Sequence, residues 1–179
     1  EGALTGSFID FRASDQTMFI GTWDKNPANS KGFFLPYKLF AEAQKEKGNV
    51  KSVSNENNRS IRAIQLPAAL AQGAAFDAQG NLWITTSNSK FGCLYRLAAS
   101  GNYQVSGQYQ MVPGIEDIGF DAAGTLWAVS EAGSKRWSGS GWKTKFPLLF
   151  AIGVVKLKPS AAQDCQPKSS DRDSSDSNE

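Results

Sequence analysis

Two stretches of the chain repeat one pattern of apolar and polar positions. Residues 71–90 read AQGAAFDAQGNLWITTSNSK, and residues 114–133 read GIEDIGFDAAGTLWAVSEAG. In each, two strand-like runs flank a short Asp-x-x-Gly segment that is typical of a tight turn. The shared core, Phe-Asp-Ala-x-Gly-x-Leu-Trp, recurs after 44 residues, from Phe76 to Phe120. This spacing lies within the roughly 40–50 residue period of propeller blades.

A weaker third copy lies at residues 6–23, GSFIDFRASDQTMFIGTW, where Phe11 occupies the position of Phe76 and Phe120. It precedes the second copy by 65 residues, about twenty more than one blade period. The polar insertion 41–60 explains the difference. We expect this insertion to be an exposed excursion, with two helical turns ending at Gly48 and a solvated loop after them.

Further strand-like runs follow the copies. Third runs lie at 32–40, 92–98 and 147–157, and fourth runs at 60–67 and 103–112. Four antiparallel strands in a unit of this length form a propeller blade. We therefore predict an all-β fold of about three β-propeller blades, near 6–66, 71–113 and 114–158, within one segment spanning 1–158.

Three blades do not close a ring, because propellers have about four to eight blades. The chain begins at Glu1 without an initiator Met or a signal-peptide pattern, which suggests a processed or truncated end. We expect the C-terminal part of a larger, six-bladed propeller, whose remaining half comes from the same parent chain or from another copy. Self-association is the less favoured of the two. Residues 159–179 are acidic and Ser-rich, and we expect them to be disordered.

Composition narrows the chemistry. The chain has 179 residues, a net charge of +2 and no histidine. The small net charge argues against nucleic-acid binding, and no apolar run is long enough to span a membrane. Without histidine, Ser-His-Asp catalysis and His-ligated zinc are excluded, so a metal would need oxygen ligands, as Ca²⁺ does. Cys93 is expected to be a small buried side chain, and a disulfide with Cys165, in the polar tail, is not favoured.

Propeller geometry groups the candidate binding residues on one rim. This rim carries the entrances of the inner strands and the loops between second and third strands, whereas the Asp-x-x-Gly turns lie on the opposite rim. The candidates are Gln72, Glu116 and Asp117 on inner strands, and Asp24, Asn88, Glu131, Arg136, Trp137 and Trp142 in loops.

Glu116 and Asp117 stand out because they interrupt an otherwise apolar inner strand. Carboxylates there would bind a cation or a sugar hydroxyl. The alternative, equally weighted, is that they pair with Lys135 or Arg136 and orient a loop. Glu131 has the same two interpretations, with the structural one favoured.

The tryptophans fall into two groups. Trp137 and Trp142 lie in Gly- and Ser-rich chain beside basic residues, where aromatic rings stack on sugars or bases. The commoner outcome is that such rings pack back onto the protein. Trp83 and Trp127 occupy matched positions in the repeat, and we expect both in the core between blades.

The repeats resemble the blades of the NHL-repeat and gluconolactonase/strictosidine-synthase-like propellers. AQGAAFDAQGNLWITTS and IEDIGFDAAGTLWAVSE are similar to that family's repeated pattern over about seventeen residues each. The resemblance implies a fold rather than one activity. Gluconolactonases of this type hold a divalent cation with Glu, Asn and Asp side chains and hydrolyse sugar lactones. Glu116 matches one ligand acid of that pattern. The equivalent positions in the second and first copies of the repeat hold Gln72 and Ser7.

Two functions are consistent with these observations. The first is a binding propeller that recognises a small molecule, glycan or protein on the rim carrying Glu116 and the 130–145 loop. The second is a Ca²⁺-dependent sugar-lactonase-like hydrolase with Glu116 as a metal ligand. Whether the chain is an enzyme stays open at this point. We expect a periplasmic or secreted location, since many propellers of this kind work there.

Overall fold

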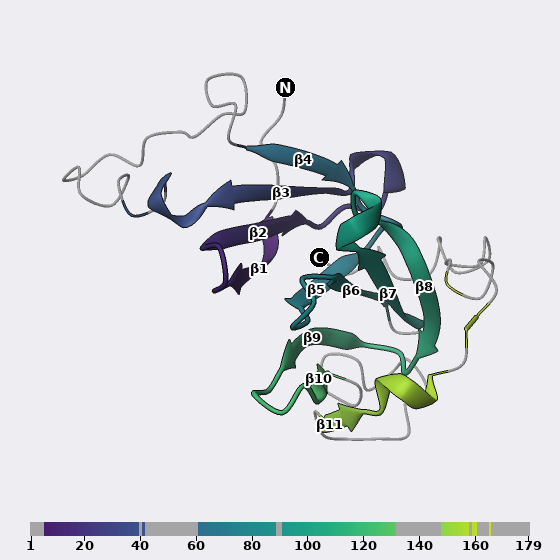
Figure 1. Ribbon diagram of the computed structural model, residues 1–179. Helices are drawn as coiled ribbons and strands as arrows, with labels where there is room; N and C mark the ends of the chain where they lie inside the picture. Colours follow the sequence, from purple (N-terminus) through teal and green to yellow (C-terminus); the bar gives the residue numbers. More distant parts are fainter. Residues whose placement is uncertain are drawn as a thin grey trace.

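The protein is described by a computed structural model that defines residues 6–39, 41, 61–88, 91–131, 148–157, 159–160 and 165. These residues form eleven strands in three antiparallel sheets (Figure 1). The first sheet has the order β1 (Gly6–Arg12), β2 (Thr17–Thr22), β3 (Lys31–Pro36), β4 (Arg62–Gln65). The second has the order β5 (Ala71–Phe76), β6 (Leu82–Ser87), β7 (Gly92–Ala98), β8 (Gln104–Met111).

The third sheet has the order β11 (Leu148–Ile152), β10 (Leu126–Ser130), β9 (Ile115–Phe120). Short 3-10 helices occur at η1 (Pro27–Asn29), η2 (Ala99–Gly101) and η4 (Val154–Lys156). None of the helices in the described ranges has the length and hydrophobicity of a membrane span. The predicted all-β fold of antiparallel propeller sheets is confirmed, whereas the six-bladed total stays a prediction.

The first strands of the three sheets lie next to one another. β5 contacts β1 on one side and β9 on the other, and the three sheets follow one another in space (Figure 1). Within each sheet the strands then run outward in sequence order. The sheets therefore pack face to face, with β1, β5 and β9 innermost, as propeller blades do.

The repeated Phe-Asp-Ala-x-Gly-x-Leu-Trp motif has a defined structural role. Asp77 accepts hydrogen bonds from turn N–H groups and from Nε1 of Trp83, the last at 2.9 Å. Asp121 repeats the arrangement with Trp127, also at 2.9 Å. Each turn also holds a glycine at positive φ, Gly80 at 77° and Gly124 at 80°. The Asp-to-Trp spacing is thus typical of a turn whose aspartate binds and orients the indole of the following strand.

The core between the first two sheets corrects the expectation about the cysteines. Cys93, on β7, forms a disulfide with Cys165, with 5.5 Å between their Cα atoms, and both residues are fully buried. Tyr95 donates a hydrogen bond to the carbonyl of Cys165. Cys93 is buried, as expected, but the prediction against a disulfide was wrong because Cys165 reaches this core.

Other described residues after β11 also bind the second sheet. Pro159 forms a bridge with Tyr109, and Ser160 N–H donates to the carbonyl of Gln108. The remainder of the predicted disordered tail lies outside the described residues. The same is true of the 41–60 insertion apart from residue 41.

The core between the second and third sheets contains Trp83 but not Trp127. Trp83 is 5% exposed and packs among residues of both sheets, whereas Trp127 is 40% exposed. The prediction that both indoles lie between blades was therefore wrong for Trp127. The reason is geometric, because Trp127 lies on the face of the third sheet that points away from the second.

Candidate functional site

The loops at the entrances of the inner strands are linked from sheet to sheet by backbone hydrogen bonds. Leu70 N–H donates to the carbonyl of Asp24, and Gly114 N–H donates to that of Asn88, each at 2.9 Å. Glu131 N–H in turn donates to the carbonyl of Gly114 at 2.9 Å. The structure therefore brings Asp24, Asn88 and Glu131 to one end of the sheets, the predicted rim.

Two of these side chains are used to shape their own loops. Asp24 Oδ1 accepts the N–H of Asn26 at 2.7 Å, and Asn88 Oδ1 accepts the N–H of Phe91 at 3.0 Å. Such local bonds from Asp and Asn side chains stabilise turns. Their binding role stays a prediction.

The matched positions at the strand entrances differ in their surroundings. Ser7 Oγ donates to the carbonyl of Ala71 on the neighbouring inner strand at 3.1 Å. Gln72 and Glu116 are half-buried, and the Glu116 carbonyl lies 3.4 Å from Thr85 Oγ1. Ser7 thus joins the first two sheets.

Two carboxylates converge on the central inner strand β5, and only one of them was predicted. Asp10, on β1, accepts the N–H of Phe76 at 2.8 Å. Asp117, on β9, packs against Gly73, where a Cβ would lie only 2.7 Å from its Cα and Oδ1. Asp117 is exposed, and its Oδ1 accepts the N–H of Ile118 at 2.9 Å. β5 is therefore flanked by one acid from each neighbouring sheet.

Asp10 is influenced by its burial and by the charge of Asp117. Burial raises the pKa of Asp10, the backbone N–H groups of Phe76 and Phe11 oppose that rise, and the charge of Asp117 adds to it. Desolvation and a like charge both disfavour the ionised form of a carboxyl group. The pair therefore favours a group that supplies positive charge or hydrogen-bond donors.

Sequence reasoning missed Asp10. The matching positions in the other copies are Ala75 and Gly119, so only the first repeat carries an acid there. The presence of an acid at this position in one copy alone was the only local sequence feature that pointed to Asp10. Its proximity to Asp117 depends on the packing of three sheets and is not visible in any local pattern.

A complete metal site is not found in the described part of the chain. Within those ranges, no three His, Cys, Asp or Glu residues gather closely enough to hold an ion. The described acids therefore do not match the ligand set that the lactonase resemblance implied, and Glu116 as a calcium ligand stays a proposal. Arg136, Trp137 and Trp142, and with them Lys135, lie outside the described residues.

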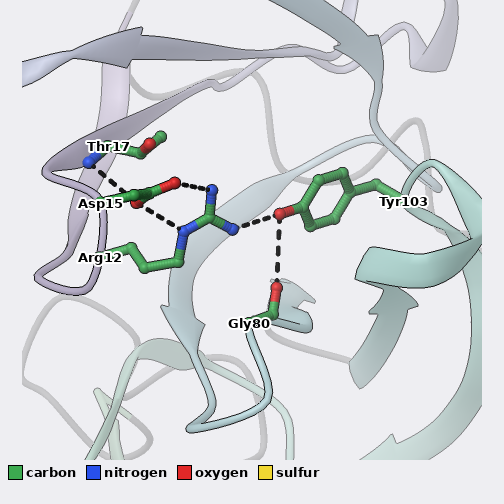
Figure 2. A network of polar contacts seen from close by, with 5 residues as sticks. All are labelled: Arg12, Asp15, Thr17, Gly80 and Tyr103. Atoms are coloured by element: carbon green, nitrogen blue, oxygen red, sulfur yellow. Dashed lines mark hydrogen bonds and ion pairs between the residues drawn. The ribbon is translucent and has the colours of Figure 1, made fainter.

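A second polar network includes Arg12, at the end of β1, and Gly80, in the turn between β5 and β6 (Figure 2). Arg12 binds both carboxylate oxygens of Asp15, at 2.9 and 2.8 Å, and also donates to the hydroxyl of Tyr103. That hydroxyl lies 3.4 Å from the carbonyl of Gly80, and Thr17 N–H donates to Asp15. The hydrogen bond from Arg12 is the main cause that lowers the pKa of Asp15.

This network joins the first two sheets. Arg12 comes from β1 and also lies over the ring of Phe76, 4.7 Å from its centroid, whereas Tyr103 precedes β8. A groove of about 360 Å³ beside it includes Arg62 in its lining. Since the members of the network bind one another, we assign it a structural role.

Comparisons with known proteins address the fold. No family model matches the sequence, and no curated protein matches it. Similar solved structures include a candidate gluconolactonase, with 17% identity and a TM-score of 0.48, aligned over 73% of this chain and 43% of that one. Another is a glucose dehydrogenase, with 9% identity and a TM-score of 0.43, aligned over 83% of this chain and 40% of that one.

This chain spans less than half the length of either structure. The likeness is one of fold, and no activity is taken from either protein. The NHL-repeat resemblance stays a prediction.

Proposed function

We propose that this chain is a binding segment of a β-propeller that recognises a small cationic or polyhydroxylated ligand, including the sugars of a glycan, at its inner strands. The observation that carries the proposal is the convergence of Asp10 and Asp117 on β5. Glu116 precedes Asp117 on β9, nearer the strand entrance, and is half-buried.

The chemistry of the pair favours such a ligand. An ammonium group or a sugar hydroxyl donates hydrogen bonds to carboxylate oxygens, and hydrogen bonds to charged groups contribute about 1.5–3 kcal/mol each. A cation would also offset the burial and, after it, the charge of Asp117, which raise the pKa of Asp10. One carboxylate from each of two sheets gives the ligand a position fixed by the rigid scaffold rather than by a loop.

A Ca²⁺-dependent sugar-lactonase-like hydrolase is the second candidate. Carboxylate oxygens suit Ca²⁺, and Asp10 and Asp117 supply them from the two strands that flank β5. Two carboxylates are fewer than the six to eight oxygen ligands that Ca²⁺ takes. We therefore assign no reaction step to these residues.

The disulfide supports the expected location outside the cytoplasm. The Cys93–Cys165 bond crosses 72 residues of sequence and lies in the core. Disulfides persist in oxidising compartments and are rare in the cytosol. A periplasmic or secreted site of action is thus part of the proposal.

Carboxyl-carbon NMR of the full chain tests the binding proposal. The chain is titrated with 1,4-diaminobutane, glucose and calcium chloride while the Asp10 resonance is followed. We expect the diamine or glucose to shift that resonance, and Asp117→Asn to weaken the binding about 10-fold or more, the loss of one charged hydrogen bond. Asp121→Asn, at the opposite rim, is the matched control and should bind as the wild type does.

The alternatives give different results. If none of the three probes shifts Asp10, or if Asp117→Asn binds them unchanged, the binding proposal is wrong. Calcium binding that is lost in Glu116→Gln, together with cleavage of a sugar lactone, would favour the hydrolase.

A further inference from the structure

Both interfaces between sheets follow one packing rule. The aromatic residue that ends the inner strand of one sheet packs on an aromatic residue in the second strand of the preceding sheet. Phe76 contacts Phe19 with 6.2 Å between ring centroids, and Phe120 contacts Trp83 at 6.0 Å, both edge to face. Edge-to-face pairs at such distances are favourable beyond the area that they bury.

The repeat contains a third pair whose members lie at opposite ends of the molecule. Phe11, the second-last residue of the inner strand β1, is 46% exposed, and its ring meets that of Tyr37 edge to face at 5.6 Å. No sheet among the described residues precedes β1. Trp127, in β10, is 40% exposed, and no sheet of the described residues follows the third one. One open face thus carries the inserting ring, and the other carries the receiving ring.

The open face of the third sheet matches a covered face of the second. Trp127 is paired with Ala151, and Val129 with Leu149, so the four share one face. The corresponding face of the second sheet carries Trp83 opposite Arg96 and Thr85 opposite Leu94. Leu94 is fully buried there, whereas Leu149 is 71% exposed.

The open face of the first sheet matches the inserting faces of the other two. Ile9 alternates with Phe11 on β1 and is 54% exposed. Ala74 and Ile118, two residues before Phe76 and Phe120, are its equivalents, and both are buried in the interfaces. Large exposed apolar side chains on contiguous surface mark interaction sites.

We propose that a second copy of this chain covers these faces, with the first sheet of each copy docked head to tail on the third sheet of the other. Phe11 of one copy packs on Trp127 of its partner, as Phe120 packs on Trp83 within the chain. A head-to-tail contact between identical chains closes a ring when the rotation permits it. Two copies of three sheets give six, within the range of known propellers.

The occupant follows from the faces themselves. The chain carries both halves of a contact that it makes twice internally, so a second copy has the matching ring for each of the two open faces. The sequence alone favoured the parent chain over self-association, and the matched faces support self-association. The assembly is independent of the ligand proposed for Asp10 and Asp117.

Sedimentation velocity of the purified chain tests the assembly. We expect a particle of twice the 19.3 kDa chain mass. Phe11→Asp and Trp127→Arg should each give the single-chain mass while retaining the wild-type β-sheet circular dichroism. Val105→Asp alters a residue that is 49% exposed on the outer strand β8, and this control should leave the mass doubled.

Mixing the two interface variants separates this contact from any other. A Phe11→Asp copy keeps an intact third sheet, and a Trp127→Arg copy keeps an intact first sheet, so an equimolar mixture retains one good contact. We expect the mixture to recover part of the doubled mass, which neither variant shows alone. A single-chain mass for the wild type, larger assemblies, or a doubled mass that both variants retain would overturn the proposal.

Discussion

The second and third sheets share one motif but differ in what covers it. In both, an aspartate at the turn binds the indole of the next strand at 2.9 Å. Trp83 is nevertheless 5% exposed and Trp127 40% exposed. The local sequence therefore determines the turn and the indole orientation, whereas burial depends on whether another sheet follows.

The neighbours of Trp83 show what the third sheet lacks. Trp83 stacks on Tyr109 and meets Phe120 edge to face, with centroids 6.0 Å away in each case. Arg96 lies over its ring at 5.9 Å. Removing the two tryptophans should therefore have very different costs.

The largest effect is expected from Trp83→Ala. Truncating a buried aromatic residue costs about 3–5 kcal/mol, whereas surface substitutions usually change stability by no more than about 0.5 kcal/mol. Urea unfolding should give a loss in that higher range for Trp83→Ala and a loss of about 1 kcal/mol or less for Trp127→Ala at low protein concentration. Equal losses would contradict the difference in burial.

The next effect concerns the disulfide that only the second of these two sheets carries in the described part of the chain. The Cys93–Cys165 bond spans 72 residues, and disulfides typically contribute about 2–4 kcal/mol of stabilisation. Dithiothreitol should lower the urea midpoint of the wild type. The Cys93→Ala/Cys165→Ala variant should start at the lower midpoint and not respond. An unchanged wild-type midpoint under full reduction would contradict a stabilising role.

The smallest effect compares the two turn aspartates. Asp77→Ala leaves the N–H of a buried indole without its partner, which costs about 1–3 kcal/mol, and Asp121→Ala should cost less because its turn is exposed. Thermal unfolding of both variants measures this difference. Greater destabilisation by Asp121→Ala would show that burial does not determine it.

The contribution of Asp121 should also depend on pH. The hydrogen bond from Trp127, followed by that from Thr125, lowers the pKa of Asp121 below its ordinary 3.8. A lowered pKa stabilises the folded state above the unfolded value, and this stabilisation disappears as the pH falls through the folded value. The difference between the wild type and Asp121→Ala should therefore be present at pH 7 and vanish in strong acid. A difference that persists there would exclude a role for the ionised carboxylate.

Local patterns predicted the parts of the fold that local interactions determine. The spacing from Asp77 to Trp83 predicts the tight turn, and the glycine at positive φ follows from the same motif. The alternating runs predicted the strands and their antiparallel order. These features involve residues within about one blade of each other.

The features that the sequence did not predict depend on distant segments. Cys165 joins Cys93 across 72 residues, and Asp10 approaches Asp117 only because β1 and β9 flank β5. The exposure of Trp127 depends on a neighbouring sheet and not on its own motif. No periodicity encodes such contacts, so the acidic pair emerged only from the three-dimensional arrangement.

The glycine at position 73 has a consequence for the curvature of the whole arc. A methyl group there would collide with the backbone of β9, because it would lie 2.7 Å from both the Asp117 Cα and the Glu116 carbonyl oxygen. The inner strands β5 and β9 can approach this closely only because residue 73 has no side chain beyond a hydrogen atom. A Gly73→Ala substitution would push β9 away from β5 and so increase the separation of Asp117 from Asp10.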